Sequence, residues 1–348
     1  MQVRIGTRAS ALALTQTGHV AADLTAAGLE VETVRVRTEG DRSRASLAAL
    51  GGTGVFVTAL RDALLEGRCD VAVHSFKDLP TGAAPGLVVA AVPVRQDPRD
   101  ALCARDGLTL AELPRGARVG TGSPRRAAQL RAARPDLDVV DLRGNVDTRL
   151  GRVAGGSGPG DLDAVVLARA GLARLGRLDA VTEVFDADLM LPAPGQGALA
   201  VEVRAEDASG DGALAAALRT LDDPATRLAV TAERALLARL EAGCAAPVGA
   251  LAQLVGDQLE LQAVVAGVDG SRALRRTLAA PAADVAAAAD LGTRVADLLL
   301  EDGAAELAPV GPGAPGGPGA SGGPAVAGGP AGDDTAQGRG AAQPTVRG

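Results

Sequence analysis

Aromatic side chains are almost missing from this chain of 348 residues, which has three phenylalanines and neither tryptophan nor tyrosine. Proteins that bind single-stranded nucleic acid stack bases on aromatic side chains, so this scarcity argues against that function. Acidic residues outnumber basic ones, 42 to 35, whereas general DNA binding needs a clustered excess of cations. Because 47% of the residues are apolar, hydrophobic cores can still form, mainly from leucine, valine and alanine.

Cysteine is equally scarce, with three residues that form neither a CxxC metal motif nor a disulfide framework. No apolar run reaches the roughly 18 residues of a membrane span. A strand-like sequence follows the first methionine, where a signal peptide would have its hydrophobic region. We therefore expect a cytoplasmic protein with no metal site and no membrane span.

The three cysteines lie in different surroundings. Cys69 precedes a strand-like run and Cys103 lies inside a short apolar run, so both are expected to be small core residues. Cys244 follows the predicted end of a helix, on a loop bounded by Gly243 and Pro247. Such a loop can present a reactive or modified thiol, although the local sequence leaves a structural role open.

Lysine occurs once among the 35 basic residues, at Lys77. It directly precedes Asp78 in a polar turn, within the sequence VHSFKDLP of residues 73–80. An ammonium beside a carboxylate at the end of a buried strand suggests a functional site. A single lysine can, however, be left anywhere by chance.

Arginines are concentrated between residues 115 and 152, where nine of them stand among four aspartates. Ser123 is a good helix N-cap and Pro124 suits the first helical position, so Arg125 and Arg126 fall in the first turn. Cations there oppose the helix dipole unless an anion binds between them. We interpret the segment as a site for a ligand with several carboxylates or phosphates. A solvated basic helix face is the alternative.

Apolar periodicity and turn residues divide the first 210 residues into two similar units of alternating strands and helices. In the first unit, strands are expected at 3–6, 31–36, 70–73 and 87–92, and helices at about 11–28 and 56–66. In the second unit, the strand and turn at 118–121 resemble those at 3–7, and the strand at 162–167 resembles the one at 70–73. This alternation predicts two α/β lobes with ligand loops at the carboxyl ends of strands.

Residues 192–203 read as a rigid turn and a strand that lead back from the second lobe to the first, with a structural role. Later segments, with a helix opening at Asp222, three strands and a helix at 285–300, predict a small α+β domain. Beyond Glu306, glycine, alanine and proline dominate, so we expect a disordered tail. The predicted domains are 1–93 with 190–210, then 94–189, then 211–305, followed by the tail at 306–348.

Taken together, several motifs resemble the porphobilinogen deaminase family, also called hydroxymethylbilane synthases. They occur in the family's order, and the resemblance covers the chain to about residue 305 but not the tail. The matching segments are 5–13, 73–80, 120–126, 142–145, 192–202, 243–244 and 247–249.

The resemblance implies a three-domain enzyme whose first two domains look like the lobes of periplasmic binding proteins. It implies a dipyrromethane cofactor joined by a thioether to Cys244. That cofactor primes the stepwise addition of four porphobilinogen molecules, each with loss of ammonia, and hydrolysis releases the linear tetrapyrrole hydroxymethylbilane. A monomer is expected, with the product passing to uroporphyrinogen-III synthase.

The resemblance also implies that Asp78 is the catalytic group. A carboxylate there would stabilise the cation left when ammonia departs and would move protons. Each pyrrole carries an acetate and a propionate, which suit planar arginine forks and hydroxyl donors. Cofactor contacts are expected from Ser75, Lys77, Thr121, Ser123, Arg125, Arg126, Arg143 and Gly144. Substrate contacts are expected from Arg8, Ser10, Arg149 and Arg174, with Arg169 as a further candidate.

Some positions depart from the family's pattern. Thr53 and Thr58 stand where the family usually has lysines, which puts any grip on carboxylates from that segment in doubt. Smaller departures are Phe76, Gly122, Pro124, Ala245 and Ala246. Two other functions stay open: a non-catalytic, two-lobed binding protein for a polycarboxylate and, without a Walker motif to support it, a phosphate-handling transferase.

Overall fold

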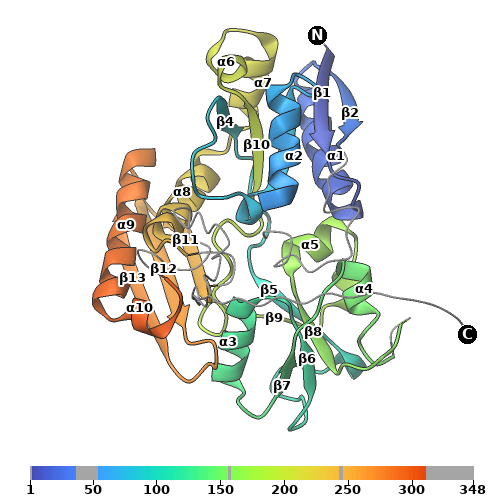
Figure 1. Cartoon of the computed structure of the whole chain (residues 1–348), viewed down its shortest axis with the longest axis vertical. Helices are drawn as coiled ribbons and strands as arrows, with labels where there is room; N and C mark the ends of the chain where they lie inside the picture. The colour runs from blue at the N-terminus through green and yellow to red at the C-terminus, as the bar shows by residue number, and fades with distance from the viewer. Residues whose placement is uncertain (1, 37–53, 156–157, 243–245, 311–348) are drawn as a thin grey trace, which may run out of the picture.

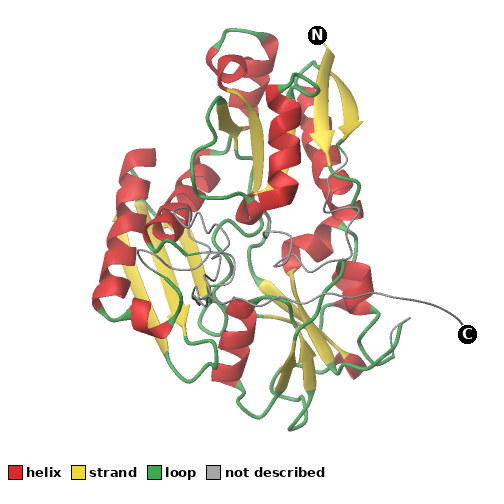
Figure 2. Cartoon of the chain, in the orientation of Figure 1, coloured by secondary structure: helices red, strands yellow, loops and turns green. Residues whose placement is uncertain are grey.

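The computed structural model describes residues 2–36, 54–155, 158–242 and 246–310. These residues form three units that meet at a common junction (Figure 1). Two units are α/β lobes built on five-stranded sheets, and the third packs helices on a three-stranded sheet (Figure 2). The predicted fold class, two α/β lobes with a small α+β unit, is thus confirmed.

The first lobe has the strand order β2-β1-β3-β10-β4, with β1 parallel to β2 and β3, and β10 antiparallel to β3 and β4. On β3, Val71 and Val73 pack with α1 and α7, whereas Ala72 packs with α2 on the other face. The strands are β1 (Gln2–Thr7), β2 (Glu30–Arg35), β3 (Val71–Ser75), β4 (Leu87–Ala91) and β10 (Leu199–Arg204). The helices are α1 (Ala11–Ala26), α2 (Gly54–Leu65), α6 (Ala205–Ser209) and α7 (Ala213–Leu221), with a 3-10 turn η2 (Phe76–Asp78).

The second lobe repeats this topology in the order β7-β6-β8-β5-β9, with two parallel pairs followed by two antiparallel pairs. The predicted repeat of the two units is therefore confirmed, and β8 occupies the place of β3. The strands are β5 (Asp100–Ala104), β6 (Arg118–Gly120), β7 (Asp138–Val140), β8 (Ala164–Ala168) and β9 (Glu183–Val184). The helical elements are η3 (Arg105–Gly107), α3 (Pro124–Ala133), α4 (Val146–Leu150), α5 (Arg169–Arg174) and η4 (Leu178–Ala180).

Two crossing segments connect the lobes: residues 92–99 lead from β4 to β5, and residues 191–198 lead back to β10. They lie side by side, because the Gln96 amide donates to the Gly197 carbonyl at 3.3 Å. Gly197 has a φ of 87°, and a Cβ there would lie 2.4 Å from the Gln96 oxygen, so glycine is required. The predicted return of the chain through residues 192–203 is confirmed.

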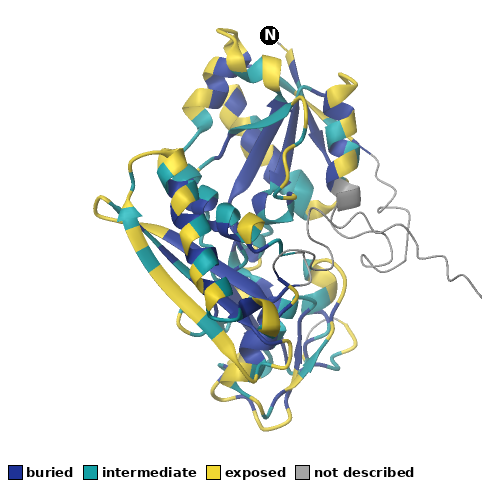
Figure 3. Ribbon diagram, turned by 60° about the vertical axis from the view of Figure 1, so that its left-hand side comes forward, coloured by how far each residue is buried: buried dark blue, intermediate teal, exposed yellow. Residues whose placement is uncertain are grey.

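In the third unit, α8 and α9 cover the buried face of an antiparallel sheet in the order β11-β12-β13 (Figure 3). The helices approach closely at Gly292, where a Cβ would lie 2.2 Å from the Ala232 oxygen. The Asp223 carboxylate caps α8 by accepting from the Thr226 amide at 2.8 Å. The elements are α8 (Pro224–Arg239), β11 (Val248–Val255), β12 (Gln258–Ala266), β13 (Ala273–Pro281), α9 (Val285–Glu301) and α10 (Ala304–Leu307).

A buried carboxylate on α8, that of Glu233, joins the third unit to both crossing segments. Arg95 donates to its two oxygens at 2.6 and 3.0 Å. The backbone amides of Gly195 and Ala252 also donate to it, at 2.6 and 2.9 Å. This carboxylate is 0% exposed and fully paired, so it ties the third unit to the two segments that connect the lobes.

Two predicted boundaries need revision. The tail was expected to begin at residue 306, but residues 304–307 form α10, and Ala308 and Val310 are buried in the core of the third unit. Helix α7 packs Leu214 and Leu218 into the core of the first lobe. The division into domains stays a prediction, and this packing leads us to propose its first border after residue 221 instead of 210.

Candidate active site

The turn that carries Lys77 and Asp78 lies at the carboxyl end of β3, in the middle of the first sheet. Both side chains are half-buried. From α8 of the third unit, Arg234 donates to the carbonyls of Phe76, Leu79 and Pro80 at 3.3, 2.9 and 2.6 Å. Its guanidinium also lies 4.8 Å from the centre of the Phe76 ring. The third unit therefore fixes the backbone of this turn.

Arg125 and Arg126 begin α3 as predicted, after Ser123 and Pro124, but they are only 4% and 6% exposed. The alternative of a solvated basic helix face is therefore wrong. Their shared counter-charge is Asp100, which is 0% exposed and accepts from Arg125 at 2.7 Å and from Arg126 at 2.8 and 3.0 Å. This aspartate was not predicted from the sequence, although a carboxylate directly before the apolar run of β5 was a signal for it.

The Asp100 carboxylate is held in its ionised form. Burial alone would raise its pKa, but the charges of Arg125 and Arg126 outweigh burial and hold the pKa far below the usual range. One buried carboxylate does not satisfy both guanidinium groups, because Arg125 Nε has no hydrogen-bond partner among the described residues. The pair can therefore accept a further anionic ligand.

Lys77 connects the turn to this arginine pair. Its ammonium donates to Oε1 of Gln196 at 3.2 Å, and it lies within electrostatic range of Asp78, Asp100, Arg125 and Arg126. Burial lowers the pKa of Lys77 to about 8, although the neighbouring Asp78 opposes that shift. Among the described residues, none donates a hydrogen bond to the Asp78 carboxylate. This carboxylate is thus left available to a ligand.

Arg149, on α4, adds a further cation near Arg126. Burial, followed by the charges of Arg126 and Arg143, lowers the pKa of its guanidinium. It donates to the carbonyl of Gly144 at 2.8 Å, whereas Arg143 is exposed and pairs with Asp141 at 3.1 Å. The structure therefore places Arg149 within electrostatic range of Arg126 and leaves Arg143 at the surface.

The predicted hydroxyl donors lie at or just after the ends of β1, β3 and β6, and three of them already accept hydrogen bonds. The Ser75 hydroxyl accepts from Gln16 at 2.8 Å, and the Ser10 hydroxyl caps α1 by accepting from the Ala13 amide at 3.3 Å. Thr121 is buried and its hydroxyl accepts from the Ser123 amide at 3.3 Å. Ser123 occupies the N-cap of α3 without a side-chain capping bond.

The remaining predicted residues lie where the lobes approach each other, or outside the described chain. Arg8 follows β1 and is half-buried, and α1 packs against α5 of the other lobe. On α5, Arg174 donates to the Gly197 carbonyl at 2.7 Å and Arg169 pairs with Asp97 at 3.4 Å. The predicted cofactor residue, Cys244, and the departure at position 53 lie outside the described residues, and Thr58 lies in α2.

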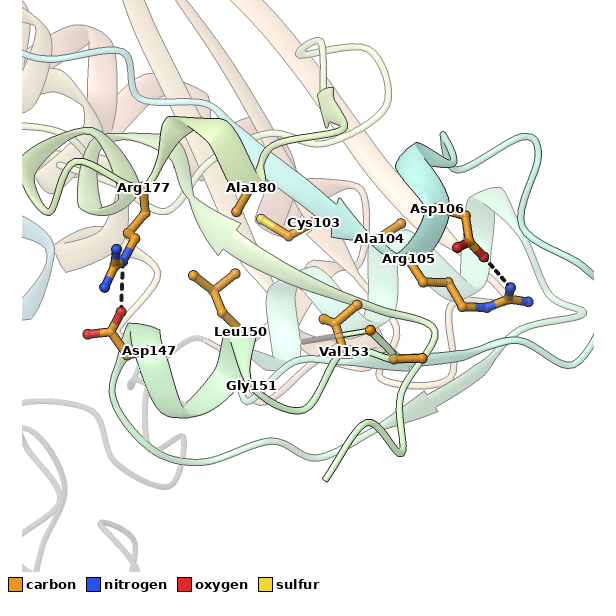
Figure 4. A pocket seen from close by; sticks show the side chains of 12 residues that line it. Cys103, Ala104, Arg105, Asp106, Asp147, Leu150, Gly151, Val153, Arg177 and Ala180 are labelled. Carbon is orange, nitrogen blue, oxygen red and sulfur yellow. Dashed lines mark hydrogen bonds and ion pairs between the residues drawn. The ribbon is translucent and has the colours of Figure 1, made fainter. Parts of the chain in front are cut away.

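A cavity of about 640 Å³ lies elsewhere in the second lobe, between β5, α4 and η4 (Figure 4). None of the predicted site residues lines it, and its charged residues are paired, as in Arg177 with Asp147 at 2.9 Å. Cys103 lies at its base, and burial raises the pKa of that thiol to about 12. This cavity is therefore separate from the cationic site.

Neither a membrane-spanning helix nor a cluster of metal ligands is found in the part of the chain that the structure describes. No helix in residues 2–36, 54–155, 158–242 and 246–310 is both long and apolar enough to cross a membrane. Within the same ranges, histidine, cysteine and acidic residues form no group of three or more that could hold a metal ion.

The titration of Lys77 can be measured directly, because it is the one lysine of the chain. In ligand-free protein labelled with 13C at the lysine Cε, we expect a single resonance that titrates near pH 8, since burial disfavours the ammonium. Unfolded protein in urea should titrate near the usual value of about 10.4. A folded-state titration at that usual value would contradict the geometry of the site.

Asp100→Asn should lower the free energy of unfolding by about 3–5 kcal/mol, because two buried guanidinium groups lose their shared counter-charge. Urea unfolding at neutral pH measures the change. Asp147→Asn is the matched control in the same lobe, because its ion pair with Arg177 is about half exposed and should contribute little. Equal effects of the two substitutions would remove Asp100 from its proposed structural role.

Comparison with known proteins shows the family to which the chain belongs. The family described as "Porphobilinogen deaminase, dipyromethane cofactor binding domain" matches residues 3–211, and "Porphobilinogen deaminase, C-terminal domain" matches residues 227–301. The porphobilinogen deaminase of Cutibacterium acnes is 60% identical over 88% of this chain and 96% of its own length. That of Leifsonia xyli is 59% identical over 88% of this chain and 94% of its own length.

Among solved structures, the methionine-binding protein MetQ aligns with 63% of this chain and 89% of its own, with 12% identity and a TM-score of 0.39. With both family descriptions matched in order and relatives this similar along nearly their whole length, the chain belongs to the porphobilinogen deaminase family.

Proposed function

We propose that this protein joins four porphobilinogen molecules head to tail on a bound dipyrromethane primer and releases hydroxymethylbilane. Four ammonia molecules leave during the additions, and one water molecule is consumed when the tetrapyrrole is released. The observation that carries the proposal is the connection of the Lys77–Asp78 turn in one lobe to the buried arginine pair in the other. Such a site combines a free carboxylate with an excess of cations.

The charges of the site fit a pyrrole ligand with acetate and propionate side chains. Around the turn, four cationic side chains (Lys77, Arg125, Arg126 and Arg149) face two carboxylates, Asp78 and Asp100. The unpaired Arg125 Nε and the mutual repulsion of Arg126 and Arg149 would both be relieved by ligand carboxylates. The donors present therefore fit the dipyrromethane group.

We assign the cofactor contacts to Lys77, Thr121, Ser123, Arg125, Arg126, Arg143 and Gly144, with Ser75 beside them. The substrate contacts are assigned to Arg8, Ser10, Arg149 and Arg174. Because Arg174 already donates to the Gly197 carbonyl and Ser10 caps α1, direct contacts from these two require a change of partner.

Asp78 is assigned the chemical role. When ammonia leaves the substrate, positive charge develops on the pyrrole, and a carboxylate beside it stabilises that charge and can move a proton. Asp78 suits this role because its carboxylate lacks a donor among the described residues, while Arg234 holds the backbone of its turn. Lys77 keeps a positive charge next to the carboxylate and binds ligand carboxylates.

Cys244 is assigned as the attachment point of the dipyrromethane group, which supplies, when bound, the pyrrole end to which new units are added. The assignment rests on the motif around Cys244. The other two cysteines do not suit it, because Cys69 and Cys103 are buried and burial raises the pKa of both thiols.

We further propose that the protein acts as a monomer in the cytoplasm and that its product passes to uroporphyrinogen-III synthase. The free thiols of Cys69 and Cys103 fit a reducing compartment. A non-catalytic binding protein for a polycarboxylate is the weaker candidate. The identity of about 60% to relatives named as deaminases along most of the chain favours the enzyme.

The experiment that tests the proposal is a turnover assay with purified protein and porphobilinogen. We expect four ammonia molecules for each tetrapyrrole released, with many turnovers per protein molecule. Saturable binding of porphobilinogen without ammonia release would instead support the binding protein.

A further inference from the structure

Gln196 stands in the second crossing segment, which sequence analysis treated as structural, and its side chain uses all of its hydrogen-bonding groups. The residue is 1% exposed. Its Oε1 accepts from Lys77 Nζ at 3.2 Å. Its Nε2 donates to the Pro98 carbonyl at 2.7 Å and to Asp100 Oδ1 at 2.8 Å. One buried amide thus spans from the first lobe to the second.

The chemistry of its neighbours fixes the orientation of this amide. An ammonium can only donate and an ionised carboxylate can only accept, so Oε1 must face Lys77 and Nε2 must face Asp100. Asp100 in turn receives Arg125 and Arg126. A carboxylate at position 196 would repel Asp100, and an apolar side chain would leave Lys77 without this acceptor.

The backbone of Gln196 is held as firmly as its side chain. Arg95 Nε donates to its carbonyl at 2.7 Å, and Arg95 is itself paired with the buried Glu233. The Gln196 amide nitrogen donates to the Ala193 carbonyl at 2.9 Å. The crossing segment therefore holds Gln196 in place through contacts that do not involve Lys77.

We propose that Gln196 is a positioning residue that joins Lys77 of the first lobe to Asp100 and the arginine pair of the second, so that all three cations act on the carboxylates of one ligand. The identity of that ligand rests on the proposed function, whereas the link between the lobes does not. The charged groups around Lys77 are Asp78 on its own turn and Asp100, Arg125 and Arg126 from the second lobe.

The first test reads the Lys77 resonance in Gln196→Leu and Gln196→Met, which remove the acceptor at similar side-chain volume. Loss of a hydrogen bond to the ammonium should lower the Lys77 pKa by roughly one unit relative to the parent protein. Gln129→Leu is the matched control, because Gln129 is also buried and binds the neighbouring Leu191 backbone without contacting Lys77. In Gln129→Leu, the pKa of Lys77 should stay the same as in the parent protein.

The second test is the dependence of porphobilinogen turnover on pH, at equal pyrrole content in all proteins. Binding of ligand carboxylates requires the protonated Lys77, so activity should fall as the pH rises through the Lys77 pKa. In Gln196→Leu that fall should occur roughly one pH unit lower. The KM for porphobilinogen should rise more than kcat falls, because binding loses a correctly placed cation.

Three results would decide against the proposal. An unchanged Lys77 pKa in folded Gln196 variants would overturn it. Unfolding of both Gln196 variants, when Gln129→Leu folds, would assign Gln196 a structural role and would overturn it too. An unchanged pH profile would show that Lys77 does not depend on Gln196 for binding. If the parent protein does not turn over porphobilinogen, the proposed function is wrong. The titration of Lys77 still tests whether Gln196 positions this lysine.

Discussion

Asp78→Asn should reduce the turnover of porphobilinogen by about 10²- to 10⁴-fold, with little change in KM. The substitution keeps the size of the side chain but removes the negative charge that stabilises the cation formed when ammonia leaves. The backbone of the turn should stay in place, because Arg234 holds the carbonyls on both sides of Asp78. Steady-state kinetics with ammonia detection measure both constants.

The control is Asp23→Asn, which neutralises an exposed carboxylate on α1 of the same lobe and should leave kcat unchanged. The lysine resonance gives an independent reading, because Asp78 raises the Lys77 pKa and its neutralisation should lower that pKa further. A variant with normal turnover would remove Asp78 from its assigned role.

Cys244→Ser should abolish both the covalent pyrrole adduct and tetrapyrrole synthesis, because a serine hydroxyl is a much poorer nucleophile than a thiol. The loss of turnover should be complete within detection, a larger effect than that of Asp78→Asn. Intact mass spectrometry and the turnover assay measure the two effects on one preparation.

Cys103→Ala serves as the control for the loss of a thiol. Cys103 is 3% exposed and burial raises its pKa to about 12, so it should carry no adduct and its loss should leave the adduct intact. A Cys244→Ser protein that still makes tetrapyrrole at the normal rate would show that the thioether is not required.

Local sequence signals predicted the elements of this fold well. Alternating strands and helices gave the two lobes, and the repeated glycine-threonine turns after β1 and β6 reflect a shared strand order. The start of α3 after Ser123 followed from the residues preferred at the N-cap and the first helical position. These features depend on neighbours within a few residues, which a single sequence contains.

Contacts between distant residues could not be predicted in this way. Arg125 was expected to bind a ligand anion, but it pairs with Asp100, 25 residues earlier in the chain. No periodicity in the sequence connects these two residues. Gln196 contacts Lys77 from 119 residues away. Its segment was interpreted as a structural turn because glycine and proline dominate it locally. Residues 306–310 were assigned to the tail rich in glycine, alanine and proline, yet Val310 is buried in the core of the third unit.

The unusual use of lysine was the exception. All the other basic residues are arginines, so the single lysine marked the site from composition alone. The structure shows what this ammonium contacts: Lys77 donates to Gln196 and lies beside Asp78 and close to the arginine pair. Composition did not mark Asp100, which is one of 42 acidic residues, so only its place before the apolar run of β5 could have done so.

The central claim is that one polyanionic pyrrole chain, tethered through sulfur, is held by cations from both lobes. Intact mass spectrometry with peptide mapping tests it most directly, on protein purified from a tetrapyrrole-making host. We expect the mass of two linked pyrrole units on the peptide that contains Cys244, and a colour reaction with an aldehyde reagent for pyrroles. An unmodified Cys244 in fully active protein would contradict the claim.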